Sequence, residues 1–492
     1  MKNKLSLQNK AISSIKWTTL QTIIVGVFGP ATLIIKARYL SPEEFAYVAI
    51  INLIIGLFNL FEDFGISQAV IQRDKINKEE SSSLFYFNIL FCVLVAVALY
   101  FLSPLIAEFF SLPKLNTYLP LISIIVLLSG PTLLFRAFLQ KGLYFKHLSI
   151  IAIIRSLLIL ISLTVFLVTD LGVKAVIFGN IIGSLFTAFA IIFVAMYFRL
   201  VKISFYFMPR KILPFLRFGL FVLLKQIFTF IAHRVDEVVI GYFLAPEVLG
   251  IYHFGKNMLL NIRSIITSSF GKVLYPVLSK LKNHKERLAE AYLKISRYIA
   301  FGSFPIFTGI ALTAHYFVPV VFGAEWIDSV IVFQVFSITM IFLVLTANVA
   351  TSLLLAINKP AELLYIDLIT NTIYFISLFL VAVFGMKAIL LAYSFYVVYK
   401  TVILQIYASR QLKQSFKTYL NELRKPFIIS LLMAMPVLIF QFTAGRLMGD
   451  ISVLICSVFI GTAFFILLAW RLEKKTIMDL KRASFKGEFN NK

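Results

Sequence analysis

Charged residues are scarce in this chain: Asp, Glu, Lys and Arg together make up 14% of the 492 residues, and 60% are hydrophobic. Soluble domains have about 25% charged and about 45–50% apolar residues, so the composition excludes a soluble multidomain enzyme. Cysteine is also nearly absent, since the two residues, Cys92 and Cys456, both lie in apolar runs. That excludes a disulfide framework or a thiolate metal site. No metal, phosphate-loop or catalytic-triad motif occurs, so we expect no cofactor and no enzyme activity.

Long hydrophobic runs are what the sequence has instead. A bilayer core about 30 Å thick needs about 20 apolar residues in a helix, and about fourteen segments satisfy this length. They are approximately 16–38, 44–65, 83–105, 118–138, 148–168, 173–198, 215–242, 250–275, 298–322, 328–355, 361–384, 387–408, 426–444 and 451–471. The predicted fold class is therefore an all-α polytopic membrane protein.

Basic residues outnumber acidic ones, with 47 Lys and Arg against 23 Asp and Glu and a formal net charge of +24. In a soluble protein this excess would indicate a nucleic-acid partner. Here most of the basic residues fall in alternate connectors between the spans, as the positive-inside rule describes. We therefore expect no nucleic-acid partner, and we expect both termini in the cytoplasm.

Short similarities recur along the chain at a similar spacing, which indicates an internal duplication. Three pairs match in the same order: Tyr39–Glu43 with Phe243–Glu247, Phe64-Gly65 with Phe270-Gly271, and Gly172–Ala175 with Gly385–Ala388. Each copy holds six spans, and an even number makes both copies enter the membrane from the same side. The sequence thus predicts two parallel six-helix repeats that form two lobes around a central cavity, a transporter architecture.

The repeat also predicts how the chain is divided. The expected parts are 1–200, the N-terminal six-helix lobe; 201–297, the seventh and eighth helices with a basic amphipathic cytoplasmic segment; 298–410, the remaining four helices of the second lobe; and 411–492, two extra helices and a basic tail. The basic segment, 280–297, is predicted to lie on anionic lipid.

Six basic residues fall within the predicted spans, where a charge costs at least about 2.5–3.5 kcal/mol and commonly faces a polar cavity or a partner. They are Arg155, Lys225, Arg234, Lys256, Arg263 and Lys400. Lys256 and Arg263 are seven residues apart and share one helix face, and the repeat aligns them with Asn52 and Asn59. We predict that Lys225, Lys256, Arg263, Asn52, Asn59, Arg155 and Lys400 line a cationic central cavity.

These assignments have structural alternatives. Arg155 and Lys400 lie near enough to the predicted cytoplasmic surface to snorkel, and Arg234 is placed to pair with Glu237 at i,i+3. Asp63 and Asp236 are the acidic residues we would test for coupling to an ion. For Asp236 a cation or proton site, a salt bridge and an interface contact all stay open.

Several short motifs stand at the ends of the spans in the first 400 residues. They are Lys16-Trp17, Ala37–Leu40, Asp63–Ile66 with Ile71–Arg73, Phe135–Lys141 with Phe145-Lys146, and Phe317–Gly323 with Trp326. In these motifs the chain resembles the Wzx-type polysaccharide flippases of the multidrug/oligosaccharidyl-lipid/polysaccharide (MOP) exporter superfamily. The colanic-acid branch is the part of the family that it resembles most.

The resemblance implies alternating-access transport of an undecaprenyl-diphosphate-linked oligosaccharide from the cytoplasmic to the periplasmic leaflet of the bacterial inner membrane, for exopolysaccharide, capsule or O-antigen synthesis. The implied partners are this cargo, membrane lipids and the polysaccharide polymerase machinery. A cationic cavity suits a diphosphate, because Lys and Arg supply charge-assisted hydrogen bonds. Two alternatives remain: a drug or metabolite cation antiporter, which would use buried carboxylates, and a membrane-embedded glycosyltransferase or polymerase, which would carry catalytic residues on a large periplasmic loop.

Overall fold

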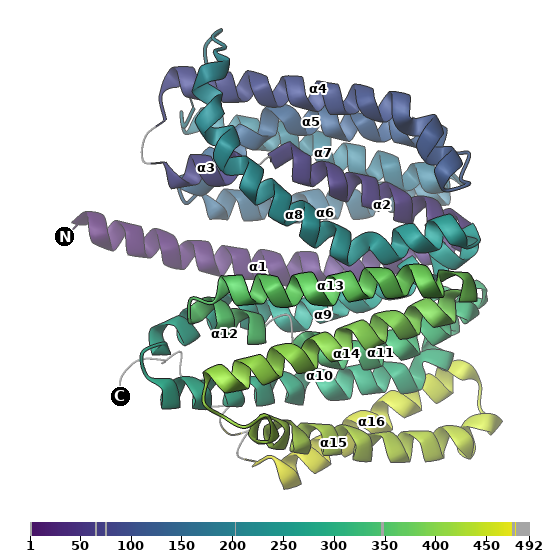
Figure 1. Ribbon diagram of the computed structural model, residues 1–492. Helices are drawn as coiled ribbons and strands as arrows, with labels where there is room; N and C mark the ends of the chain where they lie inside the picture. The colour runs from purple at the N-terminus through teal and green to yellow at the C-terminus, as the bar shows by residue number, and fades with distance from the viewer. Residues whose placement is uncertain are drawn as a thin grey trace. The chain divides into compact units, whose positions relative to one another are not determined.

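The computed structural model describes residues 2–63, 66–73, 76–201, 203–345, 349–474 and 478. Within these ranges the side chains of 2–12, 15, 63, 218, 221–222, 225, 268–273 and 446 are not described. The described part is helical almost throughout and contains no strand. Contacts divide the chain into two compact units, residues 1–253 and 254–492, and Figure 1 shows the helices of each unit running side by side.

The first unit contains eight α-helices and the start of a ninth. They are α1 (Lys2–Tyr39), α2 (Pro42–Asp63), α3 (Ile66–Gln72), α4 (Lys78–Phe109), α5 (Leu115–Lys141), α6 (Phe145–Val168), α7 (Val173–Tyr197) and α8 (Pro209–Phe243), followed by the first residues of α9 (Pro246–Leu281). Its most extensive contacts join α4 to α5, α6 to α7, and α1 to α6.

The second unit contains the rest of α9 and the remaining helices. They are α10 (Lys285–Phe322), η1 (Ala324–Ser329), α11 (Val330–Leu345), α12 (Thr351–Ala356), α13 (Pro360–Val381), η3 (Ala382–Phe384), α14 (Met386–Gln411), α15 (Phe416–Phe442), η4 (Ala444–Leu447) and α16 (Asp450–Leu472). Here α10 packs most extensively on α11 and α15, and α15 packs on α16.

The predicted all-α membrane fold is confirmed. Twelve helices of the described part are long and apolar enough to cross a membrane. The seventh and eighth predicted spans coincide with α8 and α9, whose 35 and 36 residues are also long enough to cross. The predicted span 328–355 falls on η1, α11 and α12. The chain is thus a multi-pass membrane protein, because bilayer hydrocarbon permits only segments that satisfy their own backbone hydrogen bonds.

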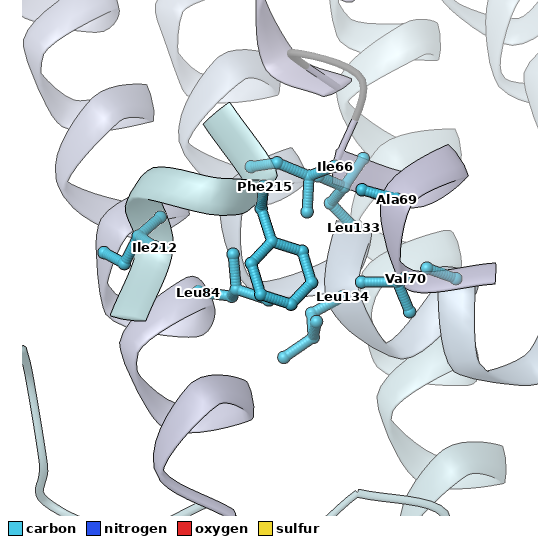
Figure 2. Packing of buried hydrophobic residues seen from close by; sticks show 9 residues of the cluster. Ile66, Ala69, Val70, Leu84, Leu133, Leu134, Ile212 and Phe215 are labelled. Atoms are coloured by element: carbon cyan, nitrogen blue, oxygen red, sulfur yellow. The ribbon is translucent and has the colours of Figure 1, made fainter. Parts of the chain in front are cut away.

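The helix α8 packs within the first unit, on α2, α3 and α4. Figure 2 shows the cluster that joins its start to three other helices. The cluster consists of Ile66, Ala69 and Val70 of α3, Leu84 of α4, Leu133, Leu134 and Ala137 of α5, and Ile212 and Phe215 of α8. Polar contacts surround it, since the Arg73 guanidinium lies 4.1 Å from the centroid of the Phe215 ring and Lys211 pairs with Glu79. The boundaries of the four parts predicted from the sequence duplication stay a prediction, because the two units of the structure are defined by contacts and not by that duplication.

The basic segment 280–297 is shared between two long helices. Its first residues end α9 at Leu281, and its last thirteen residues begin α10, which continues to Phe322 without a break. Arg297 pairs there with Glu422 of α15. The segment therefore extends two helices and does not form a separate one.

Candidate functional site

A polar pocket of about 470 Å³ lies inside the first unit, among α2, α3, α5, α6 and α7. Its polar lining consists of two arginines (Arg136, Arg155), one glutamate (Glu62), four carboxamides (Asn59, Gln68, Gln140, Asn180) and five hydroxyls (Ser67, Ser129, Thr132, Ser184, Thr187). Such groups are costly within apolar helices unless they are hydrogen-bonded or hydrated. The pocket is therefore a candidate ligand site.

Helical periodicity builds the polar wall of this pocket. On α5 the residues Ser129, Thr132, Arg136 and Gln140 follow one another at intervals of three or four, which places them on one face of the helix. From Ser129 to Gln140 this polar wall extends about 16 Å along the helix axis. On α7 the residues Asn180, Ser184 and Thr187 are spaced in the same way. In the sequence each of these walls is visible as a polar stripe within an apolar run. The predicted cavity residues do not include either stripe.

Arg155 is the only pocket residue that α6 contributes. It lies ten residues after the start of the helix, or about 15 Å along its axis. Its stem lies against α7 at Gly183, where an added Cβ would be 3.4 Å from Cγ of Arg155 and 2.6 Å from Cγ1 of Ile159. Glycine at this position thus permits the close approach of the two helices.

The guanidinium of Arg155 is only partly satisfied within the described part of the chain. Its Nε is buried and has no hydrogen-bond partner there. Arg136 and Glu62 are the charged groups that interact with it electrostatically, the first repelling and the second attracting it. A buried donor without an acceptor is unfavourable, so this arginine is well placed to receive an anionic ligand.

A second cluster of polar side chains lies where α8, α9 and α2 meet in the first unit. Arg234 donates to both carboxylate oxygens of Glu237, at 2.8 and 3.0 Å, which confirms the predicted i,i+3 pair. Nδ1 of His253 lies 3.0 Å from the Glu237 carboxylate, and its Nε2 lies 3.4 Å from Nδ2 of Asn52. Asn52 therefore belongs to this network, whereas Asn59, two turns further along α2, lines the pocket.

Asp236 lies next to this network and is 1% exposed. Its carboxylate accepts hydrogen bonds from the hydroxyl of Tyr252 and from the backbone N–H of Glu237. These contacts do not test whether Asp236 couples transport to an ion, so that role stays a prediction. Asp63, the other predicted coupling residue, ends α2, and its side chain lies outside the described part.

In the second unit two predicted cavity residues lie near one tyrosine. Lys256 is 2% exposed, and its Nζ is 5.8 Å from the centroid of the Tyr393 ring. Arg263 is half-buried, interacts electrostatically with Tyr393, and has a buried Nε with no hydrogen-bond partner among the described residues. Lysine and arginine thus follow one another along α9 beside the same aromatic side chain.

Lys400 is held by partners from its own unit. Its Nζ lies 2.9 Å from Oδ1 of Asp367 and donates to the hydroxyl of Tyr396 at 3.0 Å. Lys225 is part of α8, and its side chain lies outside the described part. Among the predicted cavity residues, Asn59 and Arg155 share the pocket of the first unit. The cavity assignments as a set stay predictions. Within the described residues no group of three or more His, Cys, Asp or Glu side chains is arranged to hold a metal ion.

A helical bundle whose described part has twelve membrane-spanning candidates and encloses a polar pocket defines a polytopic α-helical membrane protein. The chain belongs to the polysaccharide biosynthesis protein family, whose model matches residues 35–331. It is 26% identical to the teichuronic acid biosynthesis protein TuaB of Bacillus subtilis, over 86% of this chain and 88% of that protein. It is 25% identical to the lipopolysaccharide biosynthesis protein WzxC of Escherichia coli, over 90% of this chain and 89% of that protein.

Solved structures share the fold. The lipid II flippase MurJ in an inward closed conformation matches with a TM-score of 0.77 and 17% identity, over 94% of this chain and all of that one. An inward-facing MATE-family multidrug transporter of the MOP superfamily matches with a TM-score of 0.65 and 14% identity, over 82% of this chain and 99% of that one. The resemblance to Wzx-type polysaccharide biosynthesis proteins is confirmed, and the fold is shared with a lipid II flippase and a multidrug transporter.

Proposed function

We propose that this protein is a flippase that moves an undecaprenyl-diphosphate-linked oligosaccharide from the cytoplasmic to the periplasmic leaflet of the bacterial inner membrane. The observation that carries the proposal is the polar pocket among α2, α3, α5, α6 and α7, because a glycan needs a hydrogen-bonding path through helices that otherwise face lipid. Membership of the polysaccharide biosynthesis family supports a saccharide as the cargo.

The position of the pocket supports loading from the cytoplasm. Its lining lies toward the end of the first unit where α5 ends and α6 begins. Arg136, Lys141 and Lys146 cluster around that end, so the positive-inside rule predicts that it faces the cytoplasm. A flippase that moves its cargo from the cytoplasmic to the periplasmic leaflet must receive that cargo on the cytoplasmic side.

The basic residues of α9 are the proposed contacts for the diphosphate. Lys256 and Arg263 supply two cations on one helix face, and a diphosphate needs its charge compensated before it leaves water. A cation antiporter would require carboxylates in these positions. Alternating access between cytoplasm-facing and periplasm-facing states is the mechanism that the two-repeat architecture supports.

Export of polymer by a strain that lacks its own flippase tests the proposal. Each charge-assisted hydrogen bond contributes about 1.5–3 kcal/mol, so Lys256→Gln and Arg263→Gln should each lower the rate of export about 10- to 100-fold. The amount of protein in the membrane should not change. Lys387→Gln, at an exposed position at the start of α14, is the matched control and should export normally. Normal export by both α9 variants would refute the proposed role of these residues.

A further inference from the structure

The chain that joins α7 to α8 exposes apolar side chains for which the proposed function gives no role. We call residues 199–220 the connector segment, which begins after α7 and includes the first turns of α8. Among its described residues, the exposed large apolar side chains are Phe205, Phe207, Met208, Leu213 and Leu220. The side chain of Phe205 is exposed completely. Surfaces in contact with water rarely present apolar side chains in such a group, so the connector segment contacts lipid or a partner protein.

Hydrogen bonds to the start of α4 hold the connector segment in place. The backbone N–H of Ser204 donates to the hydroxyl of Ser82 at 2.9 Å, and the backbone N–H of Met208 donates to the hydroxyl of Ser83 at 3.1 Å. Both of these α4 serines are buried. The chain is therefore fixed on either side of Phe205, so its exposed ring is held at a defined place on the surface.

The connector segment also carries a surplus of positive charge. Arg199, Arg210 and Arg217 are exposed. The two acidic side chains in the adjoining first turn of α4 are each in an ion pair, one with Lys211 and the other with Arg73. The three exposed arginines thus complement an anionic partner, and guanidinium groups form charge-assisted hydrogen bonds with phosphate oxygens.

The exposed residues of α8 in this segment form one outward face, because they follow one another at intervals of three or four. They are Arg210, Leu213, Arg217 and Leu220. The opposite face, with Ile212 and Phe215, is buried in the cluster of Figure 2. Figure 1 shows these first turns crossing the start of α4 steeply, with the preceding chain extending beyond α4 to the side. Helices such as α4 cross the bilayer, so a segment that leaves their ends sideways follows the bilayer surface.

We propose that the connector segment is an interfacial anchor that binds anionic phospholipid of the leaflet at this end of the first unit, which the positive-inside rule predicts to be the cytoplasmic one. Phe205 and Phe207 enter the boundary between headgroups and acyl chains, as apolar side chains of interfacial segments do. The exposed arginines bind the lipid phosphates. The sideways position favours lipid over a protein partner in the cytosol, and the anchor does not depend on which cargo is transported.

Electron paramagnetic resonance of a spin-labelled Phe205→Cys variant tests the insertion. The full-length protein carries Cys92→Ala and Cys456→Ala, so that only the new cysteine is labelled, and it is reconstituted into vesicles that contain phosphatidylglycerol. The label should collide more often with oxygen, which concentrates in the bilayer, than with a water-soluble nickel chelate. A label at Lys78→Cys, exposed in the first turn of α4, is the matched control and should show the opposite preference. Equal exposure of both labels to the nickel chelate would place Phe205 in water and overturn the proposal in favour of a protein partner.

The ratio of inserted to free label at position 205 tests the preference for anionic lipid. In vesicles with phosphatidylglycerol, Arg210→Gln and Arg217→Gln should each lower this ratio about fivefold, which is the usual effect of one basic residue at an anionic surface. In vesicles of phosphatidylcholine alone the same substitutions should leave the ratio unchanged. Lys174→Gln, exposed in the first turn of α7 at the other end of that helix, should change neither ratio. Equal effects of the arginine substitutions in both lipids, or no effect in either, would refute anionic lipid as the ligand.

Discussion

Removal of the Glu237 carboxylate should destabilise the first unit strongly. The side chain is fully buried and binds Arg234, which is 26% exposed, and His253, which is 2% exposed. Breaking a buried ion pair by removing one partner costs about 3–5 kcal/mol, because the remaining charge stays desolvated. Glu237→Gln keeps the shape of the side chain and removes the charge. In large domains the unfolding midpoint falls by about 2 °C for each kcal/mol of stability lost. The midpoint of this variant should therefore fall by about 6–10 °C.

Thermal unfolding of the detergent-solubilised protein, followed by fluorescence-detected size-exclusion chromatography, measures this shift. Glu247→Gln is the matched control, because this acid lies exposed in the first turn of α9, where substitutions change stability by less than about 0.5 kcal/mol. If Glu237→Gln unfolds within 1 °C of the wild type while Glu247→Gln behaves as expected, the contacts of Glu237 with Arg234 and His253 do not stabilise the first unit as argued.

Two further predictions concern packing in the first unit. Phe215→Ala, in the cluster of Figure 2, should destabilise by about 3 kcal/mol, the lower end of the usual range since lipid replaces part of the lost packing; an unchanged unfolding midpoint would show that the cluster does not hold α8. Lys211→Met should lower the unfolding midpoint only slightly, because the pair that Lys211 forms with Glu79 is largely exposed, and that small loss should already be complete at neutral pH. The carboxylate partner raises the pKa of this lysine, so any stabilisation is complete below the unfolded value of 10.5 and is lost only as the pH rises through the higher folded value. Gly250→Ala should prevent correct folding, judged by size-exclusion profile, because the new Cβ would lie 1.7 Å from a backbone oxygen of α2. Gly302→Ala, which meets nothing within 4 Å, should fold normally, and equal behaviour of the two glycine variants would contradict this geometry.

The sequence predicted the helices well because one physical variable determines them. Each span must be about 20 apolar residues long to cross the hydrocarbon layer, and this can be counted without knowing its neighbours. Among the described residues thirteen predicted spans each fall mainly on one helix, and the predicted span 328–355 falls on η1, α11 and α12. The pair of Arg234 and Glu237 was equally accessible, because residues three apart on a helix are neighbours regardless of tertiary contacts.

The site was less accessible to sequence reasoning. The in-membrane arginine Arg155 and the amide Asn59 were predicted as cavity residues, and both line the pocket. The hydroxyl and amide stripes of α5 and α7 were overlooked, because Ser, Thr and Asn are common within membrane helices as helix–helix contacts. Nothing in sequence spacing distinguishes a stripe that faces a pocket from one that faces another helix.

The sequence by itself therefore determined the spans, the predicted orientation and the family, because hydropathy, charge and short motifs are properties of each segment. Only the tertiary structure decided which faces meet. Asn52 and Asn59 lie on one helix seven residues apart, yet one contacts His253 and the other lines the pocket with Arg155. The rotation of each helix about its own axis follows from close packing against its neighbours, at glycines such as Gly183, and that packing is a property of pairs of helices.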